Sequence, residues 1–294
     1  MRMHADEVDV DAALVRRLVA DQFPSWGGLP LERVPSGGTD NAIFRLGDEL
    51  SVRLPRIGWA VGQVDKDLRW MPVLRPRLPV AVPEPVARGQ PTAEFPWPWG
   101  IYRWLAGESL RIEELADPAQ AAIDLARCLK ALRALHDDDP PPASSRGIPL
   151  RTRDEPMRDA IAAARDEVDA AAVTAEWEAA LQVPEWDGAP VWIHGDLVPG
   201  NLLFEQGRLS AIIDFSLLCV GDPATDAMAA WTLFSAGTRG VFREELGIDD
   251  ETWARGRGWA LSCALIALPY YLDTNPFIVR SARRTIDEVL ADAP

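Results

Sequence analysis

Residues 191–214 constrain the fold of this chain most, because short apolar runs there alternate with isolated polar side chains. The last two of three such runs are joined by a turn at Gly207, which predicts a hairpin of two strands. A hairpin brings the start of its first strand next to the end of its second. Asn201 and Asp214 are therefore expected at the same open end. The three runs are VWIH (191–194), NLLF (201–204) and LSAIID (209–214).

Asp196, Asn201 and Asp214 together offer the groups that phosphoryl transfer requires. Asp196 follows the first run on a loop, where its carboxylate can face a cleft and act as a base toward a hydroxyl. Asn201 and Asp214 supply oxygen atoms of the kind that Mg²⁺ prefers. Taken singly, each residue is explained as well by turn formation in a loop of proline and glycine. The combined pattern H-G-D-x-x-x-x-N, I-I-D and G-D-P-x-x-D favours the catalytic interpretation.

This pattern resembles the catalytic segment of the aminoglycoside phosphotransferase family, which is similar in fold to the protein kinases. The resemblance covers nearly the whole chain, and residues 191–226 carry its specific part. It implies that Asp196 is the catalytic base and that Asn201 and Asp214 bind Mg²⁺. His194 is expected to hold the loop through hydrogen bonds. The matching residues are His194-Gly195-Asp196 with Asn201, Ile213-Asp214-Phe215, and Gly221-Asp222-Pro223 with Asp226.

The resemblance implies an α+β, bilobal, protein-kinase-like fold with a small β-sheet N-lobe and a large, mainly helical C-lobe. Residues 1–103 are expected to form the nucleotide-binding lobe. Residues 104–294 are expected to form the helical lobe, with the catalytic loop, the metal site and the acceptor pocket. Apolar periodicity agrees with this order. It predicts helices at 11–23, 61–74, 118–136, 154–181 and from 223 onward, and further strands at 31–34, 42–46, 50–54, 86–89 and 101–104.

The N-terminal part holds the candidate nucleotide contacts. A glycine-rich segment between two expected strands can lie over phosphates because glycine lets backbone amides approach closely, although a plain β-turn explains it equally well. Arg53 occupies the strand position where kinases carry the lysine that binds the α- and β-phosphates. Asp67 occupies the helix position where they carry a glutamate. Arginine at this strand position looks like a variation found in macrolide phosphotransferases. The residues of the glycine-rich segment are Ser36, Gly37, Gly38 and Thr39.

Residues 101–105 align with the segment that connects the two lobes of kinases. By this resemblance the backbone groups of Arg103 and Leu105 bind a purine, and Tyr102 lies at the back of the pocket. The side chain of Trp104 is better explained by core packing. The implied cofactors are ATP, with GTP as the alternative, and Mg²⁺.

The same comparison disfavours a protein acceptor. Gly195 replaces the arginine of the kinase H-R-D motif, and Asp222 follows Asp214 too closely for an activation loop. We therefore expect a small-molecule hydroxyl acceptor, with Asp226 and Asp273 as predicted substrate contacts. An aminoglycoside is favoured. The alternatives are a macrolide, which the C-terminal aromatic residues would suit, a metabolite such as choline, homoserine or a sugar, and a non-catalytic nucleotide-binding role.

The net charge supports a cationic acceptor and argues against polyanionic partners. Thirty basic and forty-five acidic residues give a formal charge of −15, which disfavours nucleic acid and anionic membrane surfaces. The three histidines and three scattered cysteines give no pattern of a zinc site or a disulfide framework. The sequence shows no signal peptide and no spanning segment, so a cytoplasmic protein, monomeric or homodimeric, is expected.

Overall fold

The computed structural model describes residues 7–35 and 40–292, so the glycine-rich segment at 36–39 lies outside the described residues. The chain divides into two compact units. The N-terminal unit comprises Met1–Arg77 and Ala81–Ala106, and the C-terminal unit comprises Leu78–Val80 and Gly107–Pro294. The division after residue 106 falls three residues beyond the boundary expected after residue 103.

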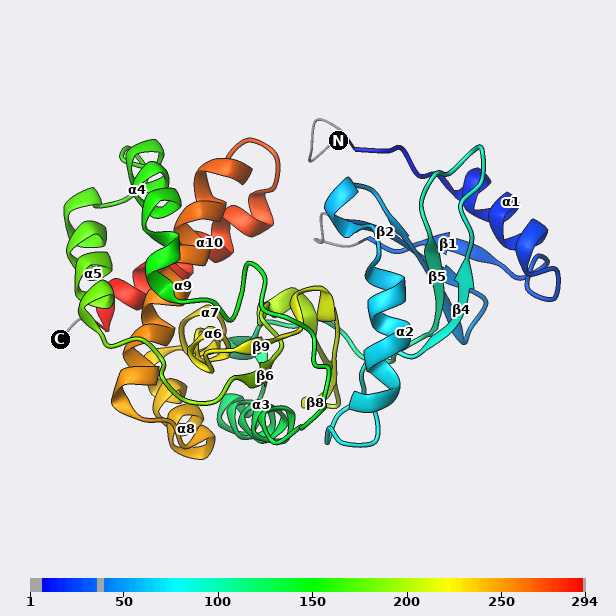
Figure 1. Cartoon of the computed structure of the whole chain (residues 1–294). Helices are drawn as coiled ribbons and strands as arrows, with labels where there is room; N and C mark the ends of the chain where they lie inside the picture. Colours follow the sequence, from blue (N-terminus) through cyan, green and yellow to red (C-terminus); the bar gives the residue numbers. More distant parts are fainter. Residues whose placement is uncertain (1–6, 36–39, 293–294) are drawn as a thin grey trace. The chain divides into compact units, whose positions relative to one another are not determined.

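The N-terminal unit is built on a five-stranded antiparallel sheet with the order β1-β2-β3-β5-β4 (Figure 1). The strands predicted from the sequence are present, with ends shifted by at most two residues. The turn between β2 and β3 contains Gly47 at φ +60°, a backbone conformation that glycine adopts without strain. The elements are α1 (Ala12–Gln22), β1 (Leu31–Arg33), β2 (Asn41–Leu46), β3 (Leu50–Pro55), η1 (Gly58–Ala60), α2 (Gln63–Leu74), β4 (Pro85–Gly89) and β5 (Trp99–Arg103).

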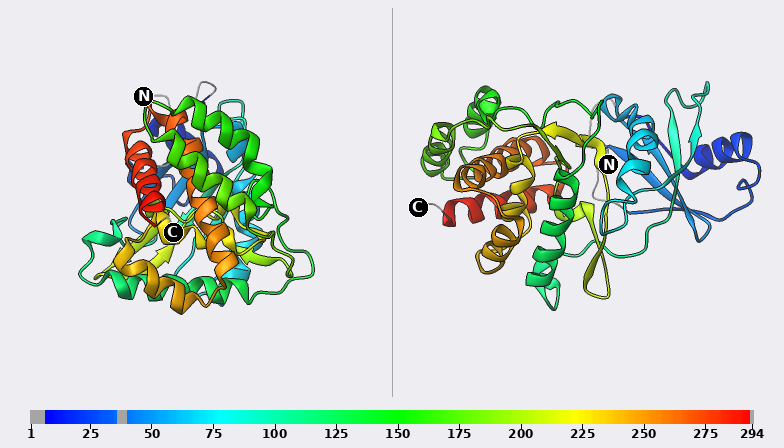
Figure 2. Two further views of the ribbon diagram at one scale, coloured as in Figure 1. Left: turned by 90° about the vertical axis from the view of Figure 1, so that its left-hand side faces the viewer. Right: turned by 60° about the horizontal axis from the view of Figure 1, so that its bottom comes forward.

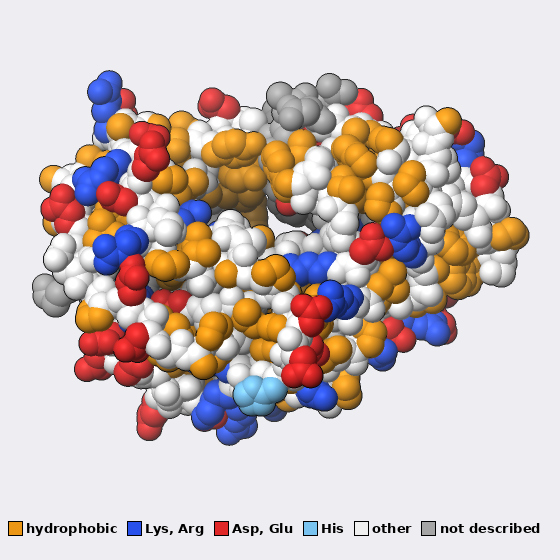
Figure 3. Space-filling view, viewed as in Figure 1, with side chains coloured by type: hydrophobic (Ala, Val, Ile, Leu, Met, Phe, Trp, Pro, Cys, Tyr) orange, Lys and Arg blue, Asp and Glu red, His pale blue; other side chains and the backbone are white. Residues whose placement is uncertain are grey.

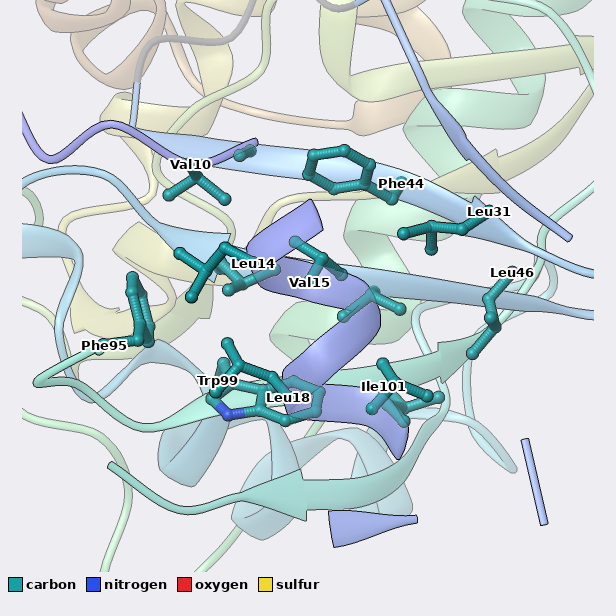
Figure 4. Close-up of a cluster of buried hydrophobic side chains, with 14 of the residues drawn as sticks. Val10, Leu14, Val15, Leu18, Leu31, Phe44, Leu46, Phe95, Trp99 and Ile101 are labelled. Carbon is teal, nitrogen blue, oxygen red and sulfur yellow. The ribbon is translucent and has the colours of Figure 1, made fainter. Parts of the chain in front are cut away.

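One face of this sheet is apolar, because side chains alternate between the two faces along each strand. Phe44 and Ile101 on this face are fully buried, and Leu14 and other apolar residues of α1 pack against them (Figure 4). α1 begins where the Asp11 carboxylate accepts a hydrogen bond from the Leu14 amide at 2.7 Å. Because alternate side chains of each strand are buried in this cluster, the side chains between them point to the opposite face.

The opposite face of the sheet carries Asn41, Arg53 and Tyr102. α2 comes close to this face because Gly100, the strand partner of Arg53, has no side chain. A Cβ at Gly100 would lie 2.6 Å from the Tyr102 ring and 2.8 Å from Val64 Cγ2 of α2. The glycine therefore allows the first turns of α2 to reach the polar side chains of the sheet.

The C-terminal unit is mainly helical and contains two short antiparallel strand pairs, β6–β9 and β7–β8. The predicted helical character from residue 223 onward is confirmed. The elements are η2 (Ile112–Glu114), α3 (Pro118–Arg133), η3 (Leu150–Arg153), α4 (Asp154–Ala163), α5 (Ala170–Gln182), β6 (Val191–Ile193), η4 (Pro199–Asn201), β7 (Leu202–Glu205), β8 (Arg208–Ile212), η5 (Phe215–Leu217), β9 (Cys219–Gly221), α6 (Ala224–Ala227), α7 (Ala229–Thr232), α8 (Ala236–Leu246), α9 (Asp250–Tyr271) and α10 (Pro276–Ala291).

α9 runs through the middle of the C-terminal unit, between α4 and α5 on one side and α10 on the other (Figure 2). Its residue Gly258 permits close packing against two other elements. A Cβ at Gly258 would lie 2.6 Å from Leu150 Cδ2 of η3 and 2.8 Å from Ala180 Cβ of α5. α9 is therefore the surface on which η3 and α5 are placed.

The long helix predicted at 154–181 is wrong, because the structure has two helices there, α4 and α5. α4 ends at Ala163, and the Asp169 carboxylate starts α5 by accepting hydrogen bonds from the amides of Ala171 (3.1 Å) and Ala172 (3.0 Å). The alanine-rich composition favours helix on both sides and hides this capping residue. The strand β9 was also not predicted, because its three residues give too short a run.

The surface of the described residues mixes both charges. On the face shown in Figure 3, Asp and Glu side chains are interspersed with Lys and Arg side chains. Some charges of the protein are paired, as in Arg208 and Asp124, whose Nε and Oδ2 atoms lie 2.8 Å apart. Such exposed pairs contribute little each to stability. None of the helices within residues 7–35 and 40–292 combines the length and the hydropathy needed to span a bilayer.

Candidate functional site

The β7–β8 hairpin of the C-terminal unit holds Asn201 and Asp214 at one end. Leu202 is paired with Ile212 in the ladder, and the Ile213 amide donates a hydrogen bond to the carbonyl oxygen of Asn201 at 2.9 Å. Asp214 is the next residue after this bond. The predicted arrangement of Asn201 and Asp214 at a shared hairpin end is therefore confirmed, while their role toward a metal stays a prediction.

His194 follows β6 and is almost completely buried. Its Nδ1 accepts a hydrogen bond from the Asp196 amide at 3.2 Å, so the ring proton is on Nε2, which donates to the Ile213 carbonyl at 3.1 Å. The ring also packs edge-on against Phe215, with the ring centroids 4.6 Å apart. The imidazole thus joins the loop after β6 to the end of β8. The prediction that His194 holds this loop by hydrogen bonding is confirmed.

Asp226 of α6 fixes the backbone at the start of the same loop. Its Oδ2 accepts from the His194 amide and its Oδ1 from the Gly195 amide, both at 2.8 Å. The residue has no exposed surface. This geometry does not support the predicted substrate contact of Asp226, which stays a prediction, because both carboxylate oxygens are engaged by the backbone and neither faces solvent. Its role is to orient the residues that precede Asp196.

Asp222 and Arg255 in turn position α6. Arg255 Nε of α9 lies 2.8 Å from Asp222 Oδ2 in a buried ion pair, and Asp222 Oδ1 accepts from the Ala224 amide at 2.9 Å at the beginning of α6. Arg255 Nη1 also donates to the Pro184 carbonyl at 3.0 Å. This buried pair has its remaining hydrogen-bonding groups occupied, which such pairs need in a protein interior. It ties α9 to the short helix that carries Asp226.

Asn201 and Asp196 are joined directly. The Asn201 Nδ2 group donates to the Asp196 carbonyl oxygen at 2.9 Å and to the Asp196 Oδ2 at 3.0 Å. With the amide nitrogen turned to Asp196, Asn201 Oδ1 is left as the acceptor end of the side chain. One side chain therefore orients the carboxylate and presents a neutral oxygen of the kind that Mg²⁺ accepts.

Asp214 adopts a left-handed backbone conformation with φ +63°, and its Oδ1 accepts from the Ser216 amide at 3.3 Å. Outside glycine this conformation is uncommon, and it is found preferentially at functional sites. Among the described residues no group of three or more His, Cys, Asp and Glu side chains is arranged to hold a metal. Mg²⁺ needs fewer protein ligands when nucleotide phosphates complete its coordination. Asp214 and Asn201 Oδ1 fit such a site.

The surroundings of Asp196 shift the pKa of its carboxyl upward. Burial raises the pKa of its carboxyl above the usual value, while the nearby guanidinium of Arg146 lowers it, the carboxylate of Asp214 raises it, and His194 lowers it. A carboxylate with a raised pKa accepts a proton more readily from a hydroxyl. The loop thus presents a carboxylate suited to general-base chemistry.

Arg146 was not recognised from the sequence. Its Nε donates to the Gly195 carbonyl at 2.8 Å, on the loop that carries Asp196. Gly195 has φ +85°, and a Cβ there would lie 2.8 Å from the Leu217 carbonyl and 3.2 Å from Arg146 Cγ. The position where protein kinases have the arginine of H-R-D is therefore closed to a side chain. A guanidinium reaches it instead from the loop before η3.

In the N-terminal unit, Asp67 of α2 joins the helix to the sheet. Its Oδ1 accepts from Gln63 Nε2 and its Oδ2 from the Tyr102 hydroxyl, both at 2.8 Å, and Arg53 Nη1 lies 3.8 Å from Oδ2. The predicted pairing of Arg53 with Asp67 is confirmed. Asp65, the other acid at the start of α2, pairs with Arg88. The predicted contacts of Arg53, Asp67 and Tyr102 with a nucleotide stay predictions.

Asn41 of β2 holds the other side of the Arg53 guanidinium. In the amide orientation that satisfies both groups, Asn41 Oδ1 accepts from Arg53 Nη2 at 2.9 Å and from Nε at 3.2 Å. Asn41 follows the glycine-rich segment by two residues. Arg53 is thus held between the strand that follows this segment and Asp67 on α2.

The segment predicted to bind a purine extends from the end of β5. The Arg103 amide donates to the Glu84 carbonyl at 2.9 Å and the Trp104 amide to the Glu49 carbonyl at 2.7 Å. Of the two backbone groups of Arg103, only the carbonyl is therefore available to bind a purine. Leu105 is the next residue after Trp104. Trp104 is half-buried under the Arg45 guanidinium, whose Cζ lies 4.9 Å from the ring centroid. This packing agrees with the structural interpretation of its side chain.

Asp273, the second predicted substrate contact, is exposed beyond the end of α9. A contact of Asp273 with substrate stays a prediction.

The two interactions of Asp67 Oδ2 should differ in strength. We expect Tyr102→Phe to destabilise the protein by about 1.5–3 kcal/mol, because it removes a hydrogen bond to a buried carboxylate. In double-mutant cycles measured by urea unfolding, Tyr102→Phe and Asp67→Asn should couple by roughly 0.5–3 kcal/mol. Arg53→Met with Asp67→Asn should couple less, because these groups lie 3.8 Å apart.

Tyr270→Phe is the matched control, since Tyr270 is 56% exposed, and it should change stability little. A larger coupling for Arg53 than for Tyr102 would show that the ion pair, and not the hydroxyl, holds α2 to the sheet.

Comparison with known structures shows the same fold elsewhere. The GDP complex of aminoglycoside 2'-phosphotransferase-IIIa is 18% identical, with a TM-score of 0.74 over 96% of this chain and 99% of the other. The streptomycin–ATP–APH(2")-IIa ternary complex is 18% identical, with a TM-score of 0.61 over 88% and 91%. Macrolide 2'-phosphotransferase type I is 21% identical, with a TM-score of 0.65 over 94% and 97%. The predicted α+β, protein-kinase-like fold is therefore confirmed.

The sequence itself assigns the chain to a family. A search of curated protein sequences finds no significant match. The family model described as "Phosphotransferase enzyme family" matches residues 32–259, which is more than three quarters of the chain. The chain belongs to the phosphotransferase enzyme family.

Proposed function

We propose that this phosphotransferase transfers the terminal phosphoryl group of a nucleoside triphosphate to a hydroxyl of a small molecule, with Asp196 as the base. The observation that carries the proposal is the joining of Asp196 to Asn201 by the Asn201 amide, at the end of the hairpin that also holds Asp214. A turn-forming role alone would not require the Asn201 side chain to bond both the backbone and the carboxylate of Asp196.

The residues of the C-terminal unit divide the work of the reaction. Asp196 accepts the proton of the attacking hydroxyl, and its raised pKa suits that task. Asn201 Oδ1 and Asp214 would hold Mg²⁺, which when bound neutralises charge on the nucleotide phosphates. Asp226 and His194 keep the loop in place through its backbone.

The residues of the N-terminal unit bind the nucleotide in this proposal. Arg53, fixed between Asn41 and Asp67, supplies the cation for the α- and β-phosphates. The Arg103 carbonyl and the Leu105 backbone bind the purine. The glycine-rich segment at 36–39 lies over the phosphates. ATP is the proposed donor and GTP the alternative, which accords with the ATP and GDP in the two complexes described above.

The acceptor favoured by the sequence is an aminoglycoside, with a macrolide next. Similar structures support both, since one holds streptomycin and another is a macrolide phosphotransferase. Residue-level support for a polycation is reduced, because Asp226 is buried and engaged by the backbone. The acceptor is therefore proposed at the level of a small-molecule hydroxyl compound.

Replacing Asp196 tests the proposal most directly. Asp196→Asn keeps the size of the side chain, but a neutral amide cannot accept the hydroxyl proton. We expect transfer, measured by release of the nucleoside diphosphate, to fall by about 10²–10⁴-fold. Nucleotide affinity measured by calorimetry should stay near the wild-type value. Wild-type turnover in this variant would remove Asp196 from the reaction.

Replacing Asp214 tests the metal site. Asp214→Ala should weaken binding of Mg²⁺-ATP far more than binding of ATP in EDTA, because the lost carboxylate contacts the ion and not the base. Calorimetry under both conditions gives the comparison. Equal losses with and without Mg²⁺ would assign Asp214 a structural role only.

Replacing Asp226 separates loop positioning from substrate contact. In Asp226→Asn one oxygen still accepts an amide N–H, but the NH₂ group opposes the other. We expect kcat to fall by up to about 100-fold through displacement of Asp196, with little change in acceptor KM. Asp169→Asn is the control, since Asp169 also accepts from two backbone amides, at the start of α5. A rise in acceptor KM with unchanged kcat would show that Asp226 contacts the substrate.

A further inference from the structure

Two arginines flank one buried tryptophan in the C-terminal unit, close to Asp196. Arg146 Cζ lies 5.8 Å and Arg153 Cζ 5.6 Å from the ring centroid of Trp259 on α9. Trp259 is fully buried, and both arginines are half-buried. Guanidinium groups stack favourably on an indole face. We call these three residues the cationic cluster.

Arg146 of this cluster is held by the loop that carries the catalytic aspartate and by its own backbone. Its Nε donates to the Gly195 carbonyl at 2.8 Å. The segment behind it is fixed where Gly147 crosses Gly221 of β9. A Cβ at Gly221 would lie 2.2 Å from the Gly147 carbonyl oxygen, so the two backbones touch. Arg146 is thus built into the fold and does not depend on a flexible loop for its position.

Arg153 is held by α9. Its Nε lies 3.2 Å from the hydroxyl of the fully buried Ser262, one turn beyond Trp259. η3, which contains Arg153, rests against α9 at Gly258. Two separate hydrogen bonds, to the Gly195 carbonyl and to the Ser262 hydroxyl, therefore hold the two guanidiniums over the same indole.

Neither arginine of the cationic cluster forms an ion pair among the described residues. Among the described residues no carboxylate lies within 4.0 Å of either guanidinium. Burial lowers the pKa of Arg153, the nearby Cys263 raises it, and repulsion from Arg146 lowers it. Two other buried arginines of this unit are each paired with a carboxylate. Arg255 is paired with Asp222 and Arg239 with Asp292, both at 2.8 Å. Half-buried cations without such a partner are unfavourable until an anion binds.

The positions of the two charges relative to Asp196 are informative. Arg146 bonds to the carbonyl of Gly195, the residue before Asp196, whereas Arg153 is held by Ser262 of α9. The cluster therefore begins beside the catalytic carboxylate and extends away from it. A phosphoryl group in transfer would occupy only the near end. A second charged group on the molecule that presents its hydroxyl to Asp196 would reach the far end.

We propose that Arg146 and Arg153 bind a carboxylate or phosphate group of the acceptor, so that the substrate is an anionic hydroxyl compound and not a polycationic aminoglycoside. This rests on the proposed function. The acceptor oxygen bonds to the terminal phosphorus as the bond to the nucleoside diphosphate breaks, and the hydroxyl proton passes to Asp196. The planar fork of arginine matches a carboxylate or a phosphate with two hydrogen bonds.

Calorimetry with four probe compounds tests the binding step. Glycerate carries a hydroxyl and a carboxylate, glycerol is neutral, choline is a cation and kanamycin is a polycation. We expect glycerate to bind the Mg²⁺-ADP complex of the wild type more tightly than the other three. Arg153→Gln should weaken glycerate binding about 10- to 100-fold, the loss expected for one charge-assisted contact, and Arg153→Lys should restore part of it.

Arg165→Gln is the matched control, because Arg165 is 75% exposed and lies in the loop between α4 and α5. It should bind glycerate as the wild type does. Thermal unfolding of each variant checks that the fold is kept, and Arg146→Lys serves as a second probe of the cluster. Glycerate binding that is unaffected by Arg153→Gln, or that is absent in the wild type at millimolar concentration, overturns the proposal.

The nucleotide is the other source of phosphate, so its affinity is measured in the same variants. A loss of ATP affinity in Arg153→Gln with unchanged glycerate affinity would assign the cluster to the nucleotide and overturn the acceptor proposal. Release of the nucleoside diphosphate with each of the four compounds then separates the acceptor proposal from the proposed function. Transfer to kanamycin without glycerate binding overturns the anionic acceptor and leaves the proposed function standing. Arg153-dependent glycerate binding without transfer to any compound supports the anion site and counts against the proposed function.

Discussion

The Asp226 carboxylate, buried among helices and bonded to two backbone amides, is the interaction on which the candidate site depends. A buried charge is tolerated only when hydrogen bonds replace its water, and the amides of His194 and Gly195 do so at 2.8 Å. Their direction sets that of the peptide leading to Asp196. The Asp222–Arg255 pair holds the helix that carries Asp226, so the site rests on a chain of buried polar contacts that begins at α9.

Local chemistry explains which features could be predicted from the sequence. The β7–β8 hairpin follows from apolar runs and a glycine turn, and the Arg53–Asp67 pair follows from one strand and one helix. The direction of Asp226 could not be predicted, because an aspartate on a short helix can face either a pocket or a neighbouring backbone. Arg146 escaped notice for a similar reason. Its contact with Gly195 joins residues 49 apart in the chain, and no local pattern records such a contact.

The net charge of the whole chain and the local charge at the proposed acceptor site favour different acceptors. A net charge of −15 describes the average field around the protein and favours cations at long range. Binding depends instead on the few groups that a bound molecule touches, and in the proposed acceptor site these include two guanidiniums over one indole. Screening by salt weakens the long-range field within about 8–10 Å, whereas half-buried groups keep most of their interaction. Specificity in this chain is therefore expected to follow the local charge.

The spacing of residues along α9 has a mechanical consequence. Arg255, Trp259 and Ser262 are four and three residues apart, so they lie on one face of the helix. That face supports both the turn before α6 and the cationic cluster. One residue inserted between Arg255 and Trp259 would rotate the two parts of the helix by about 100° relative to each other. The catalytic loop and the arginines that border it would then both lose their support on α9. The position of the loop and the position of the arginines therefore depend on the same helix face.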